Sequence, residues 1–284
     1  MNNKKIAWIT DSSSSLSKEF LAEHDNVYVV PLNIVINGVS YKENIDLTEK
    51  ELYERMQEEE GDYQTSLPAI GEFVDLYNQL KEEYDFGIAV HVSSKLSGTY
   101  QTSIMAAEIA GFPLYPIDSL TGSFPLTSLI HKGISLAKEG LAVEDLVAKL
   151  QAYKENNKMY IIPSNLQQLH KSGRISGSQK LIASLFNIKP IITFNGGEAI
   201  LKEKVRSEKK AFASVIQKLK EDYNTYKITK VAVLHANHLE KAHQLKQIIQ
   251  EELPDITIEI MMLISAAGIH TGAKTMGLAW VYEK

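Results

Sequence analysis

The alternation of strand and helix patterns in the first half of the chain restricts its fold more than any other feature. Runs rich in β-branched and aromatic residues occur at 4–10, 26–36, 86–92 and 113–117, with amphipathic helix patterns between them. Strands joined through helices need crossover connections, and such connections build a parallel sheet with helices on its faces. We therefore predict an α/β domain with a parallel sheet over residues 1–156.

The second half of the chain has a different order of elements. Residues 189–207 give a strand, an Asn-Gly-Gly turn and a second strand, which predicts an antiparallel hairpin. The last eight residues, GLAWVYEK, have the pattern of a further strand. The polar run KENNK at 154–158 separates the halves. We predict a second α/β domain, residues 157–284, with a mixed or antiparallel sheet.

Composition excludes several classes of function. The net charge of −5 provides no basic field, so we expect no nucleic-acid partner. The absence of cysteine excludes disulfides and thiolate chemistry. The apolar run at the N-terminus is too short for a signal peptide, and no stretch reaches the roughly 18–20 apolar residues of a membrane span. These features predict a cytoplasmic protein with no membrane span.

The stretch GIHTGAKTMG, residues 268–277, has part of the pattern of a phosphate-binding loop. Ala273 replaces the last glycine of that pattern, and the residues after Gly277 alternate like a strand instead of forming the required helix. We therefore predict no nucleotide site here, and the stretch alone predicts a glycine-rich turn between two strands. Glycines on both sides of His270 and Thr271 argue against an imidazole packed on an apolar face.

Loops rich in hydroxyl groups follow the predicted parallel strands. The carboxyl ends of parallel strands meet at one edge of a sheet, where ligands bind in open α/β folds. Ser97 and Gly98 are expected to open a helix, whose free N–H groups favour an anion. Capping explains any single hydroxyl, but together they predict a site for a small polar or anionic group. The loops after the strands are TDSS (10–13), SSKLSGT (93–99) and DS (118–119), and TSLP (65–68) lies just before a helix.

The histidines of HANHLEKAH raise the question of a zinc site. A spacing of five residues between His238 and His243 does not align two side chains on one helical face. Without cysteine ligands, and without an H-E-x-x-H or carboxylate-rich loop, we predict no metal site and no cofactor.

A serine hydrolase or acyltransferase is the enzymatic alternative. Ser97, Asp118 and His270 follow one another in the order found in α/β-hydrolases, although the G-x-S-x-G elbow of that fold is absent. Geometry and not order makes a triad, so this alternative stays open at the level of sequence.

Several segments spread over nearly the whole chain match the motifs of one family in order. The most specific are SSKLSGTYQ and SGRIS. The set comprises TDSSSSL (10–16), TSLPAIGEF (65–73), SSKLSGTYQTS (93–103), IDS (117–119), LHKSGRIS (169–176), IKPI (188–191) and GIHTG (268–272). The chain thereby resembles the DegV family, the bacterial fatty-acid-binding proteins that include the binding subunits of fatty-acid kinase.

The resemblance implies two α/β domains with one long-chain fatty acid enclosed between them. It assigns the ligand carboxylate to a threonine, a serine and a histidine, here Thr65, Ser97 and His270. Neighbours in the same motifs become further candidates for the ligand site: Ser66, Gly98 and Thr271. Apolar stretches at 181–188 and 260–264 are candidates for the walls of an acyl tunnel.

The resemblance also implies a partner protein. A separate fatty-acid kinase, similar to dihydroxyacetone kinase, would phosphorylate the presented carboxylate, and the acyl phosphate would feed phospholipid synthesis. The chain itself would not be an enzyme and would need no cofactor. Arg174 and Arg206 match family positions linked to phosphoryl transfer or kinase docking.

Three departures from the family pattern affect the details of these expectations. Ala273 and Lys274 replace Pro-Gly, Ser172 replaces the first glycine of G-G-R-I-S, and Leu67 stands where glutamine is common. We expect the Lys274 side chain to point to solvent. The departures leave the preferred acyl chain and the kinase partner open.

Overall fold

The chain divides into two compact α/β units. The computed structural model describes residues 4–175 and 188–283. The first unit comprises Met1–Leu47 and Thr65–Glu155, and the second comprises Thr48–Gln64 and Asn156–Lys284. The segment 48–64, which lies inside the range predicted for the first domain, thus belongs to the second unit.

The first unit is built on a parallel sheet, as predicted. Its four strands follow the order β2-β1-β6-β7, and every neighbouring pair is parallel. The register aligns the ends of β1, β6 and β7, at Asp11, His91 and Asp118, along one edge of the sheet. The strands are β1 (Ile6–Asp11), β2 (Val27–Val30), β6 (Phe86–His91) and β7 (Leu114–Asp118).

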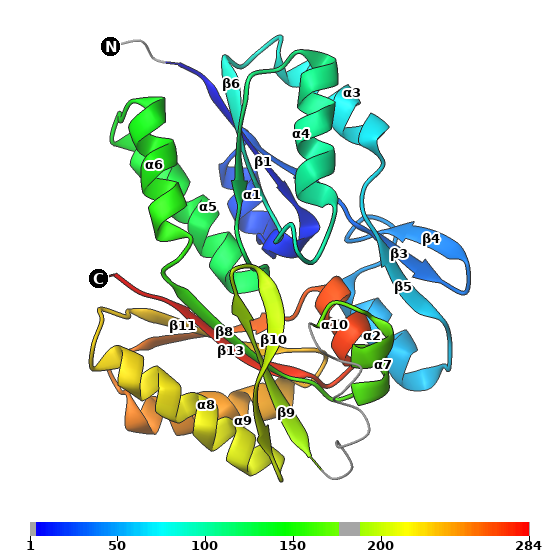
Figure 1. Cartoon of the computed structure of the whole chain (residues 1–284), viewed down its shortest axis with the longest axis vertical. Coiled ribbons are helices and arrows are strands. Elements are labelled where there is room, and N and C mark those ends of the chain that lie inside the picture. Colours follow the sequence, from blue (N-terminus) through cyan, green and yellow to red (C-terminus); the bar gives the residue numbers. More distant parts are fainter. Residues whose placement is uncertain (1–3, 176–187, 284) are drawn as a thin grey trace. The chain divides into compact units, whose positions relative to one another are not determined.

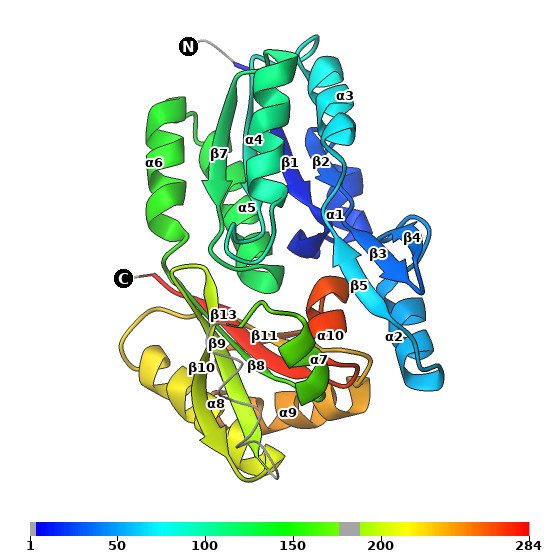
Figure 2. The same cartoon turned by 45° about the vertical axis from the view of Figure 1, so that its right-hand side comes forward.

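Helices cover both faces of this sheet (Figures 1 and 2). Side chains alternate between the faces along each strand, so Trp8 packs with α5 and α6 while its neighbour Ile9 packs with α3 and α4. A 3₁₀ turn, η1, and a short helix, α1, follow β1. The helical elements are η1 (Ser12–Ser14), α1 (Lys18–Glu23), α3 (Ile70–Leu80), α4 (Thr99–Ala110), α5 (Ser123–Lys138) and α6 (Val143–Tyr153).

The run 26–36, predicted as one strand, forms two. Pro31 has no backbone N–H to donate to a ladder, so β2 ends at Val30 and β3 begins at Asn33. The predicted turn at Asn37 and Gly38 is confirmed, with φ of 50° and 82°, as a tight hairpin turn requires. A small sheet of order β4-β3-β5 results, with strands β3 (Asn33–Ile36), β4 (Val39–Lys42) and β5 (Tyr63–Ser66).

The second unit contains a mixed sheet, which confirms the prediction. Its six strands follow the order β10-β9-β8-β13-β11-β12, and only β11 and β12 pair in parallel. The predicted hairpin is β9–β10. The strands are β8 (Asn157–Ile162), β9 (Lys189–Asn195), β10 (Glu198–Val205), β11 (Lys230–His235), β12 (Thr257–Met262) and β13 (Met276–Val281).

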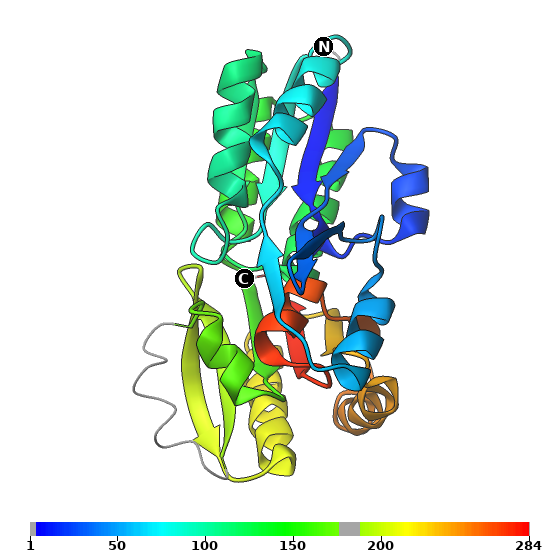
Figure 3. The ribbon, with the colours of Figure 1, turned by 90° about the vertical axis from the view of Figure 1, so that its right-hand side faces the viewer.

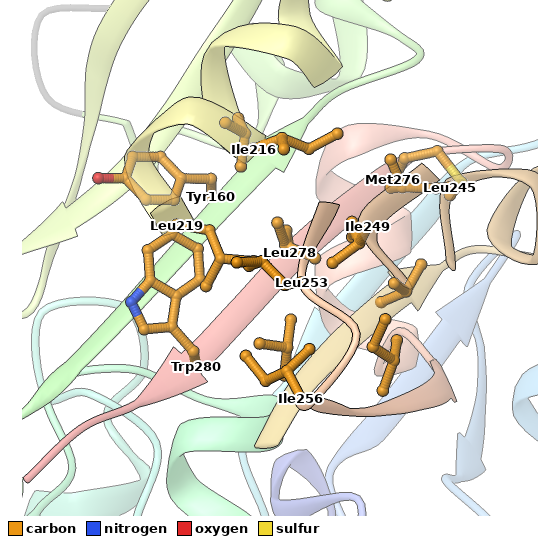
Figure 4. Packing of buried hydrophobic residues seen from close by; sticks show 14 of the residues in the cluster. Tyr160, Ile216, Leu219, Leu245, Ile249, Leu253, Ile256, Met276, Leu278 and Trp280 are labelled. Atoms are coloured by element: carbon orange, nitrogen blue, oxygen red, sulfur yellow. The ribbon is translucent and has the colours of Figure 1, made fainter. Parts of the chain in front are cut away.

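The core of the second unit lies between this sheet and two long helices, α8 (Glu208–Tyr223) and α9 (Leu239–Glu252). Figure 4 shows Trp280 of β13 beside Leu219 of α8 and Tyr160 of β8. The Trp280 ring is fully buried, and its Nε1–H donates to Asp222 Oδ2 at 2.9 Å. The large apolar ring can be buried because its single polar group keeps a partner.

The described part of the second unit also has three shorter helices: α2 (Glu49–Glu58), α7 (Leu166–Lys171) and α10 (Ser265–Thr271). α2 begins with a capping box between Thr48 and Glu51. Both α2 and α7 pack against α10, as Figure 3 shows. Residues 176–187, with most of the predicted tunnel segment 181–188, lie outside the described residues. Over residues 4–175 and 188–283, no helix combines the length and apolar character that a membrane span requires.

Candidate functional site

The loop from Val92 to Gly98 leads from the end of β6 to α4 and carries Ser97. The buried Ser93 carbonyl accepts hydrogen bonds from Leu96 N (2.9 Å) and Ser97 N (3.1 Å), which curl the loop into a turn. The Ser97 hydroxyl lies 2.9 Å from Thr99 Oγ1. Gly98 is the N-cap of α4, which confirms that Ser97 and Gly98 open a helix.

The segment with Thr65 and Ser66 lies against this loop within the first unit. Both residues are on β5, and Leu67 follows them. The Leu67 side chain would lie 3.2 Å from a Cβ added to Gly98, and its carbonyl accepts from Asn33 Nδ2 at 3.2 Å. Two of the three predicted carboxylate-binding motifs, TSLP and KLSG, therefore meet in the first unit. Thr65 is half-buried and Ser66 is exposed.

His270 lies on α10, where the sequence predicted a turn between two strands; this prediction is wrong. The helix spans Ser265–Thr271 and is held by Tyr53 of α2. The fully buried Tyr53 hydroxyl lies 2.6 Å from the Leu263 carbonyl and 2.9 Å from that of Ile264, just before α10 begins. The Tyr53 ring occupies the space that a Cβ on Gly268 would need. Tertiary contact with Tyr53 thus outweighs the low helix propensity of Gly268.

We expect Gly268→Ala to lower the free energy of unfolding by about 1–3 kcal/mol, because the added methyl must displace the Tyr53 ring. Gly71→Ala is the matched control, since Gly71 also lies in a helix but has nothing within 4 Å of its Cβ position. That change should leave stability unchanged or raise it by up to about 1 kcal/mol. Urea unfolding of both variants measures the difference, and equal effects would contradict the packing of α10 on α2.

The end of α10 is tied to the start of α7. The Thr271 carbonyl accepts from Ser164 N (3.1 Å) and Asn165 N (2.9 Å). Gly272 follows with φ of 99°, and a Cβ there would overlap Asn165, so only glycine permits this close approach. Lys274 is exposed, which agrees with the orientation predicted for it.

Arg174 follows α7 and acts electrostatically on His270. Burial lowers the pKa of His270, and the positive charge of Arg174 lowers it further, to about 4. The guanidinium donates to the Ser172 carbonyl at 2.6 Å. The second unit therefore brings the described part of the SGRIS motif, up to Ile175, together with the GIHTG motif. Arg206 follows β10 and is exposed.

The low pKa leaves the His270 imidazole neutral at neutral pH, so it is suited to hydrogen bonding and is a weak base. Because the pKa is below the unfolded value of about 6.5, neutral His270 contributes its full stability above that pH. The contribution is lost as the pH falls through about 4. We expect an NMR titration of the His270 ring to have its midpoint near pH 4. A midpoint near the unfolded value would contradict the burial of the ring.

The hydrolase alternative finds little support in this geometry. The Asp118 carboxylate accepts from Ser94 Oγ at 2.6 Å and from Leu120 N at 2.9 Å. Its oxygens are therefore hydrogen-bonded to loop residues of the first unit. A histidine with a pKa of about 4 is also poorly matched to general-base catalysis near neutral pH.

A buried polar cluster in the first unit was missed by sequence reasoning. Asp11 Oδ2 lies 3.0 Å from His91 Nδ1, and His91 Nε2 lies 2.8 Å from the Ser103 hydroxyl. The Ser103 hydroxyl in turn lies 2.5 Å from that of Tyr77. The cluster has the connectivity of a catalytic triad, but all four residues are 0% exposed, so a substrate cannot reach Ser103. The signal in the sequence that could have indicated this cluster is His91, a histidine at the end of the apolar run FGIAVH.

Of the histidines considered for zinc, His235 has a structural position. His235 is buried at the end of β11, and its Nδ1 accepts from His238 N at 3.1 Å. Burial lowers the pKa of His235, with further contributions from His238 and His243. Within residues 4–175 and 188–283, no three His, Cys, Asp or Glu side chains are grouped so that they could hold a metal ion.

Comparison with known proteins gives the same family as the motifs. A family model described as "Uncharacterised protein, DegV family" matches residues 5–283. A DegV domain-containing protein of Staphylococcus aureus strain N315 is 36% identical over 270 residues, 95% of this chain and 96% of that protein. A DegV domain-containing protein of Halalkalibacterium halodurans is 34% identical over 282 residues, 99% of both chains.

Solved structures agree over the same length. The crystal structure of DegV from Bacillus subtilis, a fatty-acid-binding protein, has a TM-score of 0.91 at 30% identity and covers 99% of this chain and 100% of that chain. A fatty-acid-binding DegV family protein from Streptococcus agalactiae gives a TM-score of 0.91 at 28% identity, with the same coverage. Matches that extend over almost the whole sequence, in relatives and in fold alike, show that this chain belongs to the DegV family.

Proposed function

We propose that this protein binds one long-chain fatty acid and holds its carboxylate with Thr65, Ser97 and His270. The observation that carries the proposal is the agreement in fold, at a TM-score of 0.91 over 99% of the chain, with DegV of Bacillus subtilis, a fatty-acid-binding protein. The placement of two of the predicted motifs against each other in the first unit supports it. Ser66, Gly98 and Thr271 are neighbouring members of the proposed site.

The chemistry of these groups suits a carboxylate that has to stay reactive. Hydroxyl groups and a neutral imidazole donate hydrogen bonds to an anion without neutralising it by a full positive charge. The acyl chain supplies the affinity: a C16 acid buries about 14 methylenes at about 0.8 kcal/mol each, roughly 11 kcal/mol before ordering costs. Strong ionic contacts at the head group are therefore unnecessary.

In this proposal the protein presents its ligand and does not catalyse a reaction. A separate fatty-acid kinase, similar to dihydroxyacetone kinase, would form the acyl phosphate on the bound carboxylate. Arg174 is assigned to kinase docking or phosphoryl transfer in this proposal. Its positive charge acts on His270 and so lies near the proposed carboxylate site. An exposed Arg206 is free of the core and available to a partner protein or to the transferred phosphoryl group.

The test is to denature the purified protein, extract it with organic solvent and identify the extract by mass spectrometry. We expect a stoichiometric long-chain fatty acid. No lipid in the extract, together with no uptake of palmitate or oleate, would refute the proposed ligand.

Two further measurements separate presentation from catalysis. ATP and Mg²⁺ should convert the bound acid to acyl phosphate only after a fatty-acid kinase is added. A fluorophosphonate probe should leave Ser97 unlabelled, whereas labelling of Ser97 would support the hydrolase.

A further inference from the structure

The buried residues Tyr77, Ser103, His91 and Asp11 form one continuous chain of hydrogen bonds through the first unit, called here the buried relay. The residues come from α3, α4, β6 and β1 respectively. The distances between neighbouring members are 2.5, 2.8 and 3.0 Å.

The relay has one direction in which every polar atom is satisfied. With Asp11 ionised, His91 donates its Nδ1 proton to Asp11 and accepts at Nε2 from the Ser103 hydroxyl, which accepts from Tyr77. Burial raises the pKa of Asp11, but hydrogen bonds from His91, Ser13 and Val92, together with the electrostatic effect of His91, lower it overall. Asp11 is therefore ionised, as this arrangement requires.

The relay holds both ends of the loop that carries Ser97. At one end, Asp11 Oδ2 accepts from Val92 N at 3.0 Å, in addition to His91. At the other end, Ser103 lies in the second turn of α4, the helix that begins directly after Gly98. His91 thus connects the strand before the loop to the helix after it.

The polarity of the relay points to a role beyond packing. Four polar side chains at 0% exposure must each recover the cost of desolvation, and apolar residues of similar shape would stabilise a core at least as well. Such a network does, however, define one geometry where an apolar core would permit several. Among the residues that the structure describes, the ligand-site candidates that the relay brackets on both sides are Ser97 and its neighbour Gly98.

We propose that the buried relay is a positioning device that sets the Val92–Gly98 loop for contact with the ligand carboxylate. The proposal rests on the proposed fatty-acid function. The residues of the buried relay act through the loop and do not touch the ligand. Breaking the relay far from the site, at Ser103 or Tyr77, should therefore weaken recognition of the carboxylate in a protein that is still folded.

The experiment uses Ser103→Ala and Tyr77→Phe in the full chain, after removal of bound lipid. Tyr28→Phe is the matched control, because the Tyr28 hydroxyl also bonds another side chain, Tyr84, at 2.9 Å and packs on the same core cluster. Affinity is measured for palmitate and for its methyl ester, which has the same chain but no carboxylate. Amide hydrogen exchange is measured over residues 92–98 in the unliganded protein.

For Ser103→Ala we expect palmitate to bind about 3- to 10-fold more weakly, the equivalent of one hydrogen bond. The methyl ester should bind as before, and exchange over 92–98 should be faster than in the Tyr28→Phe control. Tyr77→Phe should act in the same direction with a smaller effect, since it is one bond further away. Equal losses for palmitate and methyl ester, or unchanged exchange over 92–98, would overturn the proposal.

The result also separates this proposal from the one on which it rests. If the unaltered protein binds no palmitate, the fatty-acid function fails. The exchange data still decide the relay: faster exchange in Ser103→Ala supports control of the loop, and unchanged exchange refutes it.

Discussion

Replacing His270 with alanine is expected to weaken the binding of a long-chain fatty acid by about 10- to 100-fold, the worth of one hydrogen bond to a charged group. The imidazole is half-buried and neutral, with its pKa lowered to about 4. It therefore offers the carboxylate an N–H donor for which water competes little. The measurement is a titration of lipid-free protein with palmitate. Ser97→Ala should act in the same direction, because it removes a second proposed donor.

His243→Ala is the control for this prediction. His243 is in the same unit but lies exposed on α9, whereas His270 of the GIHTG motif is on α10. Its loss should leave the affinity for palmitate unchanged. If His270→Ala binds palmitate as tightly as the unaltered protein, the assignment of the carboxylate to the GIHTG motif is wrong.

Asp11→Asn is expected to lower the free energy of unfolding by about 2–4 kcal/mol, although the two side chains have almost the same shape. Each carboxylate oxygen accepts a backbone N–H at 3.0 Å, Oδ1 from Ser13 and Oδ2 from Val92. His91 and the Ser13 hydroxyl also bond to this carboxylate. In asparagine one oxygen becomes an NH₂ group, so a buried donor must face a backbone donor in either orientation.

Asp85→Asn is the matched control, because Asp85 accepts a backbone N–H from Lys5 at 2.7 Å but at an exposed position. Water can replace that bond, and stability should change by less than about 0.5 kcal/mol. Urea unfolding followed by fluorescence and circular dichroism tests both variants. A loss for Asp11→Asn no larger than that for Asp85→Asn would contradict the role of the buried carboxylate.

The same variant has a signature in the dependence of stability on pH. The pKa of Asp11 is lowered in the folded protein, against the effect of burial, by His91, Ser13 and Val92. Stability from this group is therefore fully present above the unfolded pKa of about 3.9 and is lost as the pH falls through the folded value. In Asp11→Asn, the free energy of unfolding should therefore depend less on pH in this acidic range.

Local sequence signals were sufficient for most elements of this protein. Alternating apolar patterns, the capping box at Thr48 and Glu51 and the turn at Asn37 and Gly38 act over a few residues, and the structure confirms them. Within the run 26–36, the break at Pro31 was missed. The backbone N–H that proline lacks outweighs the strong β propensity of the neighbouring residues. Motif order was also sufficient to identify the family.

Contacts between distant residues decided the rest. α10 has seven residues, too few for a stable isolated helix, and it forms because Tyr53, more than 200 positions earlier, bonds the carbonyls before it. The buried relay joins Asp11 to His91 across a separation of 80 residues. No local pattern reports such a pair, because each member reads as a single polar residue at a strand end.

The sequence by itself therefore determined the two larger sheets, the family and the residue types of the proposed carboxylate site, since periodicity and motifs depend on neighbours along the chain. Only the tertiary structure decided that His270 lies on a helix as a neutral, half-buried ring, and that the loop of Ser97 is held at both ends by buried polar groups. Burial and hydrogen bonding depend on what surrounds a group in space, and folding brings those surroundings from distant parts of the chain.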